Sequence, residues 1–224
     1  MVEIIVLRPE CVVIYKGVGV PSQPDPSGDA DAISITAARL LEMGEDSKLW
    51  LVHRLDRTVS GLMVLARTEA AASELSRLAA SDGIEKLYLA VAEGEAVGGL
   101  YEDLLYKDAR ISKAFVVKGA RRGVKAARLT CLPLAHRSER TLCRIRLHTG
   151  RYHQIRAQLS HRHTPLVGDG KYGSRDKGAA TPALVAYKLV FNLFGRRIEA
   201  VRLPDVTSYP WSIFADIITE DTLK

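Results

Sequence analysis

Short apolar runs separated by turn-forming residues recur along most of the chain, and this pattern predicts a sheet-rich protein. In one run, Thr141–Leu147, the apolar residues Cys143, Ile145 and Leu147 alternate with Arg144 and Arg146. One face of that strand is therefore expected to be buried and the other basic. The predicted strands are Ile4–Leu7, Cys11–Tyr15, Leu49–Val52, Leu62–Ala66, Lys86–Val91, Phe115–Lys118, Ala126–Leu134, Thr141–Leu147, Ala183–Phe191 and Arg197–Leu203.

Four segments have helical character. Ala32–Met43 carries apolar residues at helical spacing and is followed by Gly44, a common helix stop. Thr68 is placed to cap an alanine-rich helix that ends near Ala80. Shorter helices are predicted over Gly150–Ser160, with Thr149 near its cap, and around Ser212–Ile218.

Strands predominate over helices, and short links between neighbouring strands favour antiparallel pairing. We therefore expect an α+β fold in which helices and loops flank a mixed, largely antiparallel central sheet. Residues 1–224 are predicted to form one domain with two subregions that meet near residue 95. A chain of this length can bury a sizeable core without disulfides or metals.

Composition adds a modest basic excess. Lys and Arg number 32 against 26 Asp and Glu, which gives a net charge of +6 and points to an anionic partner. The three cysteines, Cys11, Cys131 and Cys143, have no paired spacing, so reduced thiols are expected. No apolar run is long enough to span a bilayer, and the first residues lack the basic start of a signal peptide. These features predict a cytoplasmic protein without membrane association.

The segment His53–Gly61 is the strongest candidate for chemistry. Asp56 lies there between Arg54 and Arg57, in a polar stretch between two predicted strands. Catalytic groups are often mounted on loops held by a rigid sheet. The nearby guanidinium groups favour the ionised carboxylate, which can act as a nucleophile or base while the arginines hold an anionic substrate. The alternative is a plain turn with a surface ion pair, which would contribute little.

A second cluster occupies residues 144–163 and contains four of the six histidines. Cations interleaved with stacking groups suit RNA, and a helix start is a natural phosphate site. Tyr152 can stack on a base or pack in the core. A metal site using His161 with His163, or His148 with His153, is disfavoured because no nearby carboxylate or thiolate completes a ligand shell. A solvated basic face is the other alternative.

A third basic element is the turn Lys118–Lys125, which contains Arg121 and Arg122. Such a hairpin tip can grip phosphates, which positions a nucleic acid without reading its sequence. It can equally be a solvated tip.

Three motifs in order resemble those of the RluA-type family of RNA pseudouridine synthases, and the resemblance covers nearly the whole chain. His53-Arg54-Leu55-Asp56-Arg57 with Ser60-Gly61 resembles the signature around the catalytic aspartate. Lys86-Leu87-Tyr88-Leu89-Ala90-Val91 is similar to the second motif. Thr149-Gly150-Arg151-Tyr152-His153-Gln154-Ile155-Arg156, followed by Gly168-Asp169 and Tyr172-Gly173, resembles the third.

The resemblance implies the pseudouridine synthase catalytic fold and an isomerase that acts on specific uridines in structured rRNA or tRNA. Such an enzyme cleaves the N-glycosidic bond and rejoins the base through C5, and it needs no cofactor or metal. Asp56 matches the catalytic aspartate, Tyr88 the active-site tyrosine and Arg156 the basic residue that pairs with the aspartate. A core tyrosine and a solvated helix arginine are the alternatives for the last two.

The resemblance also implies where RNA binds. The uridine has to leave its stack to reach Asp56, and His53 and Arg54 are placed to fill the gap or hold the flanking backbone. A structural ion pair with Asp56 is the alternative for Arg54. The residues expected at the RNA are His53, Arg54, Arg57, Lys118, Arg121, Arg122, Arg151, His153 and Gln154.

The sequence departs from the family pattern at Gly17, where relatives usually have proline, and at Val185, where many have histidine. The small N-terminal RNA-binding domain of some relatives has no counterpart, so we expect a monomeric catalytic domain that recognises RNA alone. An RNA-binding protein without catalysis would not need Asp56, Tyr88 and Arg156 together. A metal-dependent nuclease would need acidic ligands that the histidine cluster lacks.

Overall fold

The computed structural model describes residues 1–219. These residues form two compact units. The first unit contains Met1–Lys86 and Ala186–Arg202, and the second contains Leu87–Val185 and the chain from Leu203 onward. The chain thus passes from the first unit to the second between Lys86 and Leu87, before the expected position near residue 95, and later returns.

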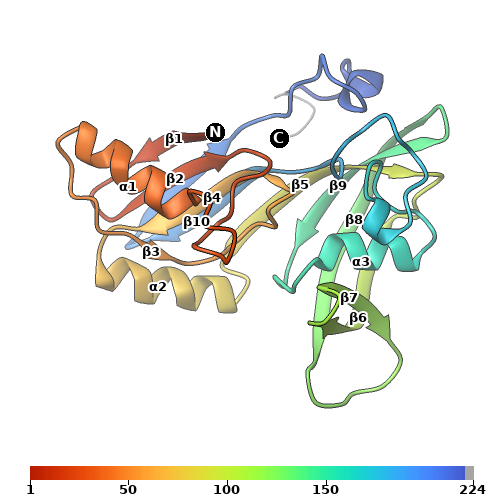
Figure 1. The fold of residues 1–224 in the computed structure, drawn as a ribbon, viewed down its shortest axis with the longest axis horizontal. Coiled ribbons are helices and arrows are strands. Elements are labelled where there is room, and N and C mark those ends of the chain that lie inside the picture. The colour runs from red at the N-terminus through yellow and green to blue at the C-terminus, as the bar shows by residue number, and fades with distance from the viewer. Residues whose placement is uncertain (220–224) are drawn as a thin grey trace. The chain divides into compact units, whose positions relative to one another are not determined.

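The first unit is a sheet with two helices beside it (Figure 1). Its strand order is β1-β2-β4-β10, while β3 pairs with β4 and β11 pairs with β10. Antiparallel pairing joins β1 to β2, β2 to β4, β3 to β4 and β10 to β11. The strands are β1 (Val2–Leu7), β2 (Cys11–Lys16), β3 (Trp50–Leu51), β4 (Ser60–Ala66), β10 (Leu184–Leu193) and β11 (Arg196–Val201), and the helices are α1 (Ala32–Glu42) and α2 (Glu69–Ala80).

Both helices begin where the sequence predicts. The Asp31 carboxylate caps α1 by accepting hydrogen bonds from the backbone N–H groups of Ile33 at 2.9 Å and Ser34 at 3.2 Å. The Thr68 hydroxyl caps α2 by accepting from the Ala71 N–H at 3.1 Å. These contacts satisfy helix N–H groups that have no partner inside the helix.

The core of the first unit is assembled from distant parts of the sequence. Val13 and Val64 from the early strands and Leu75 from α2 are fully buried. Leu189 and Phe191 from β10 pack into the same cluster. The late strands therefore complete a core that the first 86 residues begin.

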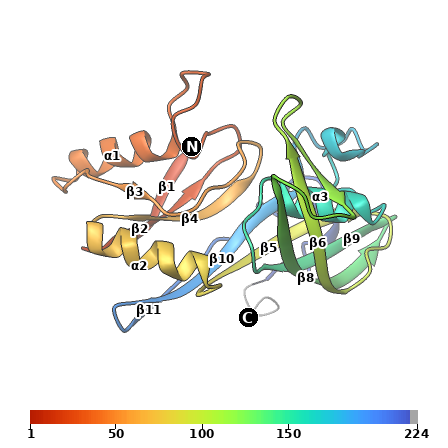
Figure 2. The same cartoon turned by 90° about the horizontal axis from the view of Figure 1, so that it is seen from below.

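The second unit is a sheet of order β5-β9-β8-β6-β7, in which neighbouring strands pair antiparallel. Helix α3 lies against this sheet (Figure 2). Its elements are β5 (Ile84–Glu93, beginning in the first unit), β6 (Gly99–Asp108), β7 (Lys113–Val117), β8 (Val124–Arg137), β9 (Arg140–Leu147), α3 (Gln154–His161) and the short 3₁₀ helices Gly170–Tyr172 and Trp211–Phe214.

The alternation predicted for Thr141–Leu147 is confirmed on β9. Cys143 and Ile145 are fully buried, whereas Arg146 is exposed. From Cys143 to Leu147 the strand therefore presents one apolar and one basic face, as a half-buried strand requires, whereas Leu142 on the basic side is fully buried.

Two predicted helices are shorter in the structure than the sequence predicts. Helix α3 begins at Gln154 rather than Gly150, because His153 adopts a left-handed backbone with φ of 51°. The Gln154 side chain closes the preceding turn by accepting from the Thr149 hydroxyl at 2.7 Å and the Arg151 N–H at 3.0 Å. Near the end of the described chain, Trp211–Phe214 is only a 3₁₀ turn, since Ile213 N–H bonds the Pro210 carbonyl three residues back.

Strand β6 was missed altogether. Its first residue is glycine and acidic residues interrupt its apolar ones, so the alternation rests mainly on Tyr101 and Leu105, which are buried. Pairing with β7 and β8 on its two sides makes the segment a strand despite this composition. No helix within residues 1–219 is long and apolar enough to cross a membrane.

Candidate active site

The Asp56 loop connects β3 to β4 in the first unit. The Val59 N–H donates to the Asp56 carbonyl at 3.0 Å and forms a tight turn. Leu55 and Val59 are buried on either side of Asp56, which is itself half-buried. Apolar anchors thus fix a short polar loop at the edge of the sheet, as predicted.

A second segment holds this loop from both sides. The Gly19 N–H donates to the Arg57 carbonyl at 2.8 Å. The Ser22 hydroxyl donates to the Leu55 carbonyl at 2.8 Å and accepts from the Leu55 N–H at 3.1 Å. The backbone groups next to Asp56 are therefore hydrogen-bonded within the protein.

Gly61 ends the loop where β4 meets β10. A Cβ at this position would lie 2.4 Å from the backbone nitrogen of Ala186, and its φ of +136° disfavours other residues. Glycine is therefore required for the close approach of strands β4 and β10. This contact explains the Ser60-Gly61 part of the motif.

Lys16 is a buried cation near the Asp56 loop. Its Nζ donates to the carbonyls of Val20 at 2.9 Å and Gly17 at 3.2 Å. Burial lowers the pKa of Lys16 to about 8, while the negative charge of Asp56 raises the pKa in part. The ammonium group and the Asp56 carboxylate attract each other, and each favours the charged form of the other. The sequence signal for this residue is a lysine at the end of an apolar strand.

The departure at Gly17 has a structural reason. Its N–H donates to the Met1 carbonyl at 2.8 Å, a bond that proline cannot make. A Cβ there would also lie 2.9 Å from the same oxygen. Val185, the other departure, is almost fully buried.

The three basic residues of the Asp56 motif differ in their contacts. Within the described residues, Arg54 is exposed and its side chain makes no hydrogen bond or ion pair. Arg57 donates to the Ser27 hydroxyl at 3.0 Å and forms an ion pair with Asp29, so it ties down the preceding loop. His53 accepts a hydrogen bond at Nε2 from the Val64 N–H at 3.1 Å, and burial lowers the pKa of its ring to about 4.

Tyr88 and Arg156 belong to the second unit. Tyr88 lies on β5 opposite Ile145 and is only 5% exposed. Arg156 is buried on α3 and donates from Nε and Nη2 to the two Asp169 carboxylate oxygens, at 2.7 and 2.8 Å. This two-bond geometry fixes the orientation of the guanidinium plane. The pairing of Arg156 with Asp56 stays a prediction.

The start of α3 is an aromatic stack rather than an open basic surface. The His153 ring stacks on Tyr152 with centroids 3.9 Å apart, and its Nδ1 lies 3.0 Å from the Tyr172 hydroxyl. The same hydroxyl accepts a hydrogen bond from the Ala114 N–H at 2.8 Å, so Tyr172 links the His153 ring to β7. Gln154 is buried as well, and its amide donates to the Arg128 carbonyl at 3.1 Å.

The other predicted RNA contacts are exposed cations of the second unit. Lys118, Arg121 and Arg122 lie between β7 and β8, and the Arg121 guanidinium lies 4.8 Å from the centre of the Tyr106 ring. Arg151 is exposed too, although its Nε donates to the Ala126 carbonyl at 2.8 Å. These four side chains remain accessible to a polyanion.

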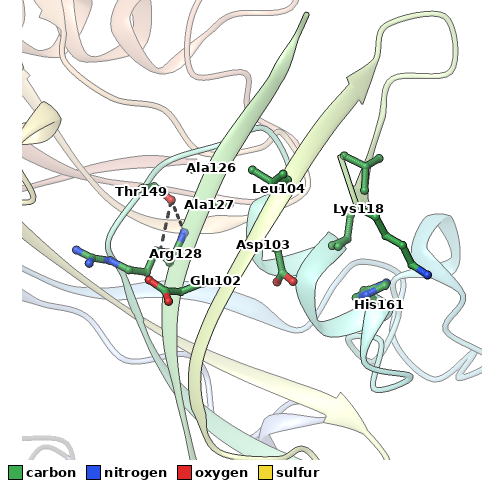
Figure 3. Close-up of a pocket in the computed structure, with 11 residues that line it drawn as sticks. Glu102, Asp103, Leu104, Lys118, Ala126, Ala127, Arg128, Thr149 and His161 are labelled. Carbon is green, nitrogen blue, oxygen red and sulfur yellow. Dashed lines mark hydrogen bonds between the residues drawn. The ribbon is translucent and has the colours of Figure 1, made fainter. Parts of the chain in front are cut away.

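An open cavity of about 780 Å³ lies beside these cations (Figure 3). Lys118 and His161 lie at one end, and Arg128, Glu102 and Thr149 lie at the other. The rest of the lining is largely apolar. A hollow with Lys118 at one end, Arg128 beside Glu102 at the other and a largely apolar wall can receive a flat base.

The histidine cluster does not assemble a metal shell in this part of the structure. Within residues 1–219, no group of three or more His, Cys, Asp or Glu side chains could hold a metal ion. Cys11, Cys131 and Cys143 are buried free thiols.

Comparison with known proteins identifies similar chains. The sequence model of a family described as RNA pseudouridylate synthase matches residues 10–161. The chain is 30% identical over 202 residues to ribosomal large subunit pseudouridine synthase D of Vibrio vulnificus, covering 89% of this chain and 59% of that protein. It is 28% identical over 211 residues to a Haemophilus influenzae protein described as an uncharacterized RNA pseudouridine synthase, covering 91% of this chain and 88% of that one. The chain thus spans only about three-fifths of the Vibrio vulnificus protein's length.

Solved structures share the fold. Human RNA pseudouridylate synthase domain containing 4 matches with a TM-score of 0.73 at 23% identity, over 90% of this chain and 88% of that chain. Human RNA pseudouridylate synthase domain containing 1 matches with a TM-score of 0.74 at 21% identity, over 92% and 84%. The α+β prediction, with its mixed and largely antiparallel sheet, is confirmed.

Proposed function

The chain belongs to the family of RNA pseudouridylate synthases, and from this membership we propose that it isomerises specific uridines in structured RNA to pseudouridine. The observation that carries the proposal is Asp56, a half-buried carboxylate on a loop held by hydrogen bonds on both sides. The buried Lys16 ammonium favours its charged form. An ionised, oriented carboxylate is what attack on the sugar or the base requires.

The reaction breaks the bond between N1 of uracil and C1′ of ribose and forms a bond between C5 and C1′. A proton leaves C5, N1 ends with a proton, and the atoms balance without a cofactor. We assign the attack to Asp56, contact with the flipped base and proton removal from C5 to Tyr88, and orientation of the aspartate to Arg156. Burial of Tyr88 and the Asp169 bonds to Arg156 support fixed positions for both side chains.

The RNA itself meets exposed cations in this proposal. Arg54, Lys118, Arg121, Arg122 and Arg151 are the accessible members of the predicted set. His53 and Gln154 hydrogen-bond to the backbone of Val64 and Arg128, and His153 bonds to the Tyr172 hydroxyl, so these three side chains support the structure near these surfaces. The names of the Vibrio relatives make large-subunit ribosomal RNA the first substrate to test, and tRNA the second.

The cellular setting is also part of the proposal. Three buried free thiols suit a reducing cytoplasm. We expect a monomer whose activity survives chelation of metals.

Replacement of Asp56 tests the proposed chemistry. We expect Asp56→Asn to abolish pseudouridine formation while leaving the fold and most of the RNA affinity intact, because only the reacting charge is lost. Pseudouridine mapping of total RNA from cells without the gene, complemented with wild type or Asp56→Asn, measures this.

Asp46→Asn, which changes an exposed carboxylate of the same unit, is the matched control and should restore the modification. Turnover by purified Asp56→Asn protein would overturn the assignment. A wild-type protein inactive on ribosomal RNA and tRNA would overturn the proposed function itself.

A further inference from the structure

Ser22 makes the side-chain hydrogen bonds that hold the backbone next to Asp56. Its hydroxyl donates to the Leu55 carbonyl at 2.8 Å and accepts from the Leu55 N–H at 3.1 Å. One side chain thereby satisfies both polar groups of a single residue, as a neighbouring strand would. Ser22 is 6% exposed and Leu55 is 7% exposed, so water does not readily replace these bonds.

The segment that carries Ser22 is itself fixed. The Lys16 ammonium donates to the Val20 carbonyl at 2.9 Å, and the Ala32 N–H donates to the Pro21 carbonyl at 2.8 Å. The Ser22 oxygen also lies 3.6 Å from the Met63 sulfur on β4. The hydroxyl is thus held between a strand of the sheet and the start of α1.

A second contact completes a bracket around Asp56. The Gly19 N–H bonds the Arg57 carbonyl at 2.8 Å, so residues 19–22 hold the residue on each side of Asp56. The peptide units that carry the Asp56 side chain then have little freedom to rotate. The position of the Asp56 side chain is therefore restricted as well.

We propose that Ser22 is a positioning residue for Asp56, acting through the Leu55 backbone, an inference that rests on the proposed function. Ser22 does not need to touch RNA in this role. Its loss should therefore lower the rate of the chemical step and leave RNA affinity nearly unchanged. A displacement of about 1 Å at a reacting group can slow a reaction about 100-fold, so a loosened loop has a large effect.

The test compares Ser22→Ala with wild type by single-turnover pseudouridine formation on a transcribed RNA substrate and by RNA binding at equilibrium. We expect the single-turnover rate constant to fall about 10- to 100-fold. The dissociation constant for RNA should change less than about twofold, since no phosphate contact is lost.

Thr36→Val is the matched control. Thr36 is a fully buried residue of the same unit whose hydroxyl donates to the Ala32 carbonyl at 2.6 Å, inside α1. Its replacement also removes one buried hydroxyl and should lower the melting temperature, but the single-turnover rate below that temperature should match wild type. A merely structural Ser22 would behave as Thr36 does.

Ser22→Cys serves if Ser22→Ala does not fold, because it keeps the volume and offers only weak hydrogen bonding. A folded Ser22 variant with a wild-type single-turnover rate overturns the positioning role. Loss of RNA binding in step with the rate overturns it as well. A wild-type protein without activity on any RNA would instead count against the proposed function, so the two failures are distinguishable.

Discussion

Individual residues near Asp56 show how burial sets charge. His53 and Lys16 can both carry a positive charge, yet their surroundings in the protein differ. The Lys16 ammonium is met by two carbonyls and by the charge of Asp56, which together offset part of its burial. The His53 ring instead accepts a backbone hydrogen bond at Nε2 and is close enough to the Lys86 charge for its pKa to fall further. His53 is therefore neutral at physiological pH.

Acid sensitivity follows from the neutral His53. The pKa of its ring is about 4 in the folded protein against 6.5 for an ordinary histidine, so the unfolded state binds the proton first as pH falls. The free energy of unfolding should decrease between pH 6.5 and 4, with His53 contributing at most about 3 kcal/mol. Urea unfolding at pH 7, 5.5 and 4 should show a smaller decrease for His53→Gln.

The same substitution at exposed His161 controls for the change of residue type. An unaltered pH dependence in His53→Gln would contradict the neutral, buried ring.

At the scale of single residues, the sequence predicted which loop carries Asp56 but not which distant residues contact that loop. The position of Asp56 in a loop between strands followed from hydrophobic patterning alone. The bond between Arg57 and Asp29 joins residues 28 apart, and the one between Ser22 and Leu55 spans 33. Such contacts depend on how loops meet in space, which no local pattern specifies.

Among the elements, those with strong periodicity and a clear cap were predicted well. α1 and α2 carry Asp31 and Thr68 at their first turns, and both begin there. Two of the failures, at the start of α3 and at β6, have one physical origin, which is that side-chain or cross-strand bonding outweighed local preference. Gln154 closed a turn where a helix was expected, and pairing on two sides made a strand of the polar β6.

The hairpin tip between β7 and β8 carries a prediction of its own. We expect Arg121→Ala with Arg122→Ala to weaken RNA binding about 5- to 50-fold, because two exposed charges that we propose contact phosphates are removed, one of them the guanidinium over the Tyr106 ring. The single-turnover rate at saturating protein should change little. Fluorescence anisotropy with a labelled RNA measures the affinity.

Arg196→Ala with Arg197→Ala provides an equal change of charge at two exposed arginines that begin β11. Equal weakening by both double variants would assign the effect to net charge and contradict a specific role for the first tip.

Across the whole molecule, a net charge of +6 is modest, and the arrangement of cations matters more than their number. Many arginines are already committed to carboxylates, including Arg140 to Asp176 and Arg162 to Asp103. Arginines in such ion pairs are less available to bind phosphate. The accessible remainder, including Arg54, Lys118, Arg121, Arg122 and Arg151, defines the surface expected to meet RNA.

Salt dependence tests this arrangement as a whole. Each neutralised phosphate releases counterions, so the logarithm of the binding constant should fall linearly with the logarithm of salt concentration. Contact with about five phosphates predicts a loss of more than 100-fold between 50 and 200 mM salt. A flat response would argue against a polyanionic substrate.

The return of the chain to the first unit has a consequence for its synthesis. β10 and β11 supply Leu189, Phe191 and Ile198 to a core that the first 86 residues leave incomplete. A ribosome has to translate residues 87–185 of the second unit before these side chains exist. Until then, the apolar surface of residues 1–86 that packs on these side chains is uncovered. The Asp56 loop can form its close contact between Gly61 and Ala186 only after Ala186 has been synthesised. The core of the first unit is therefore completed only after most of the second unit has been synthesised.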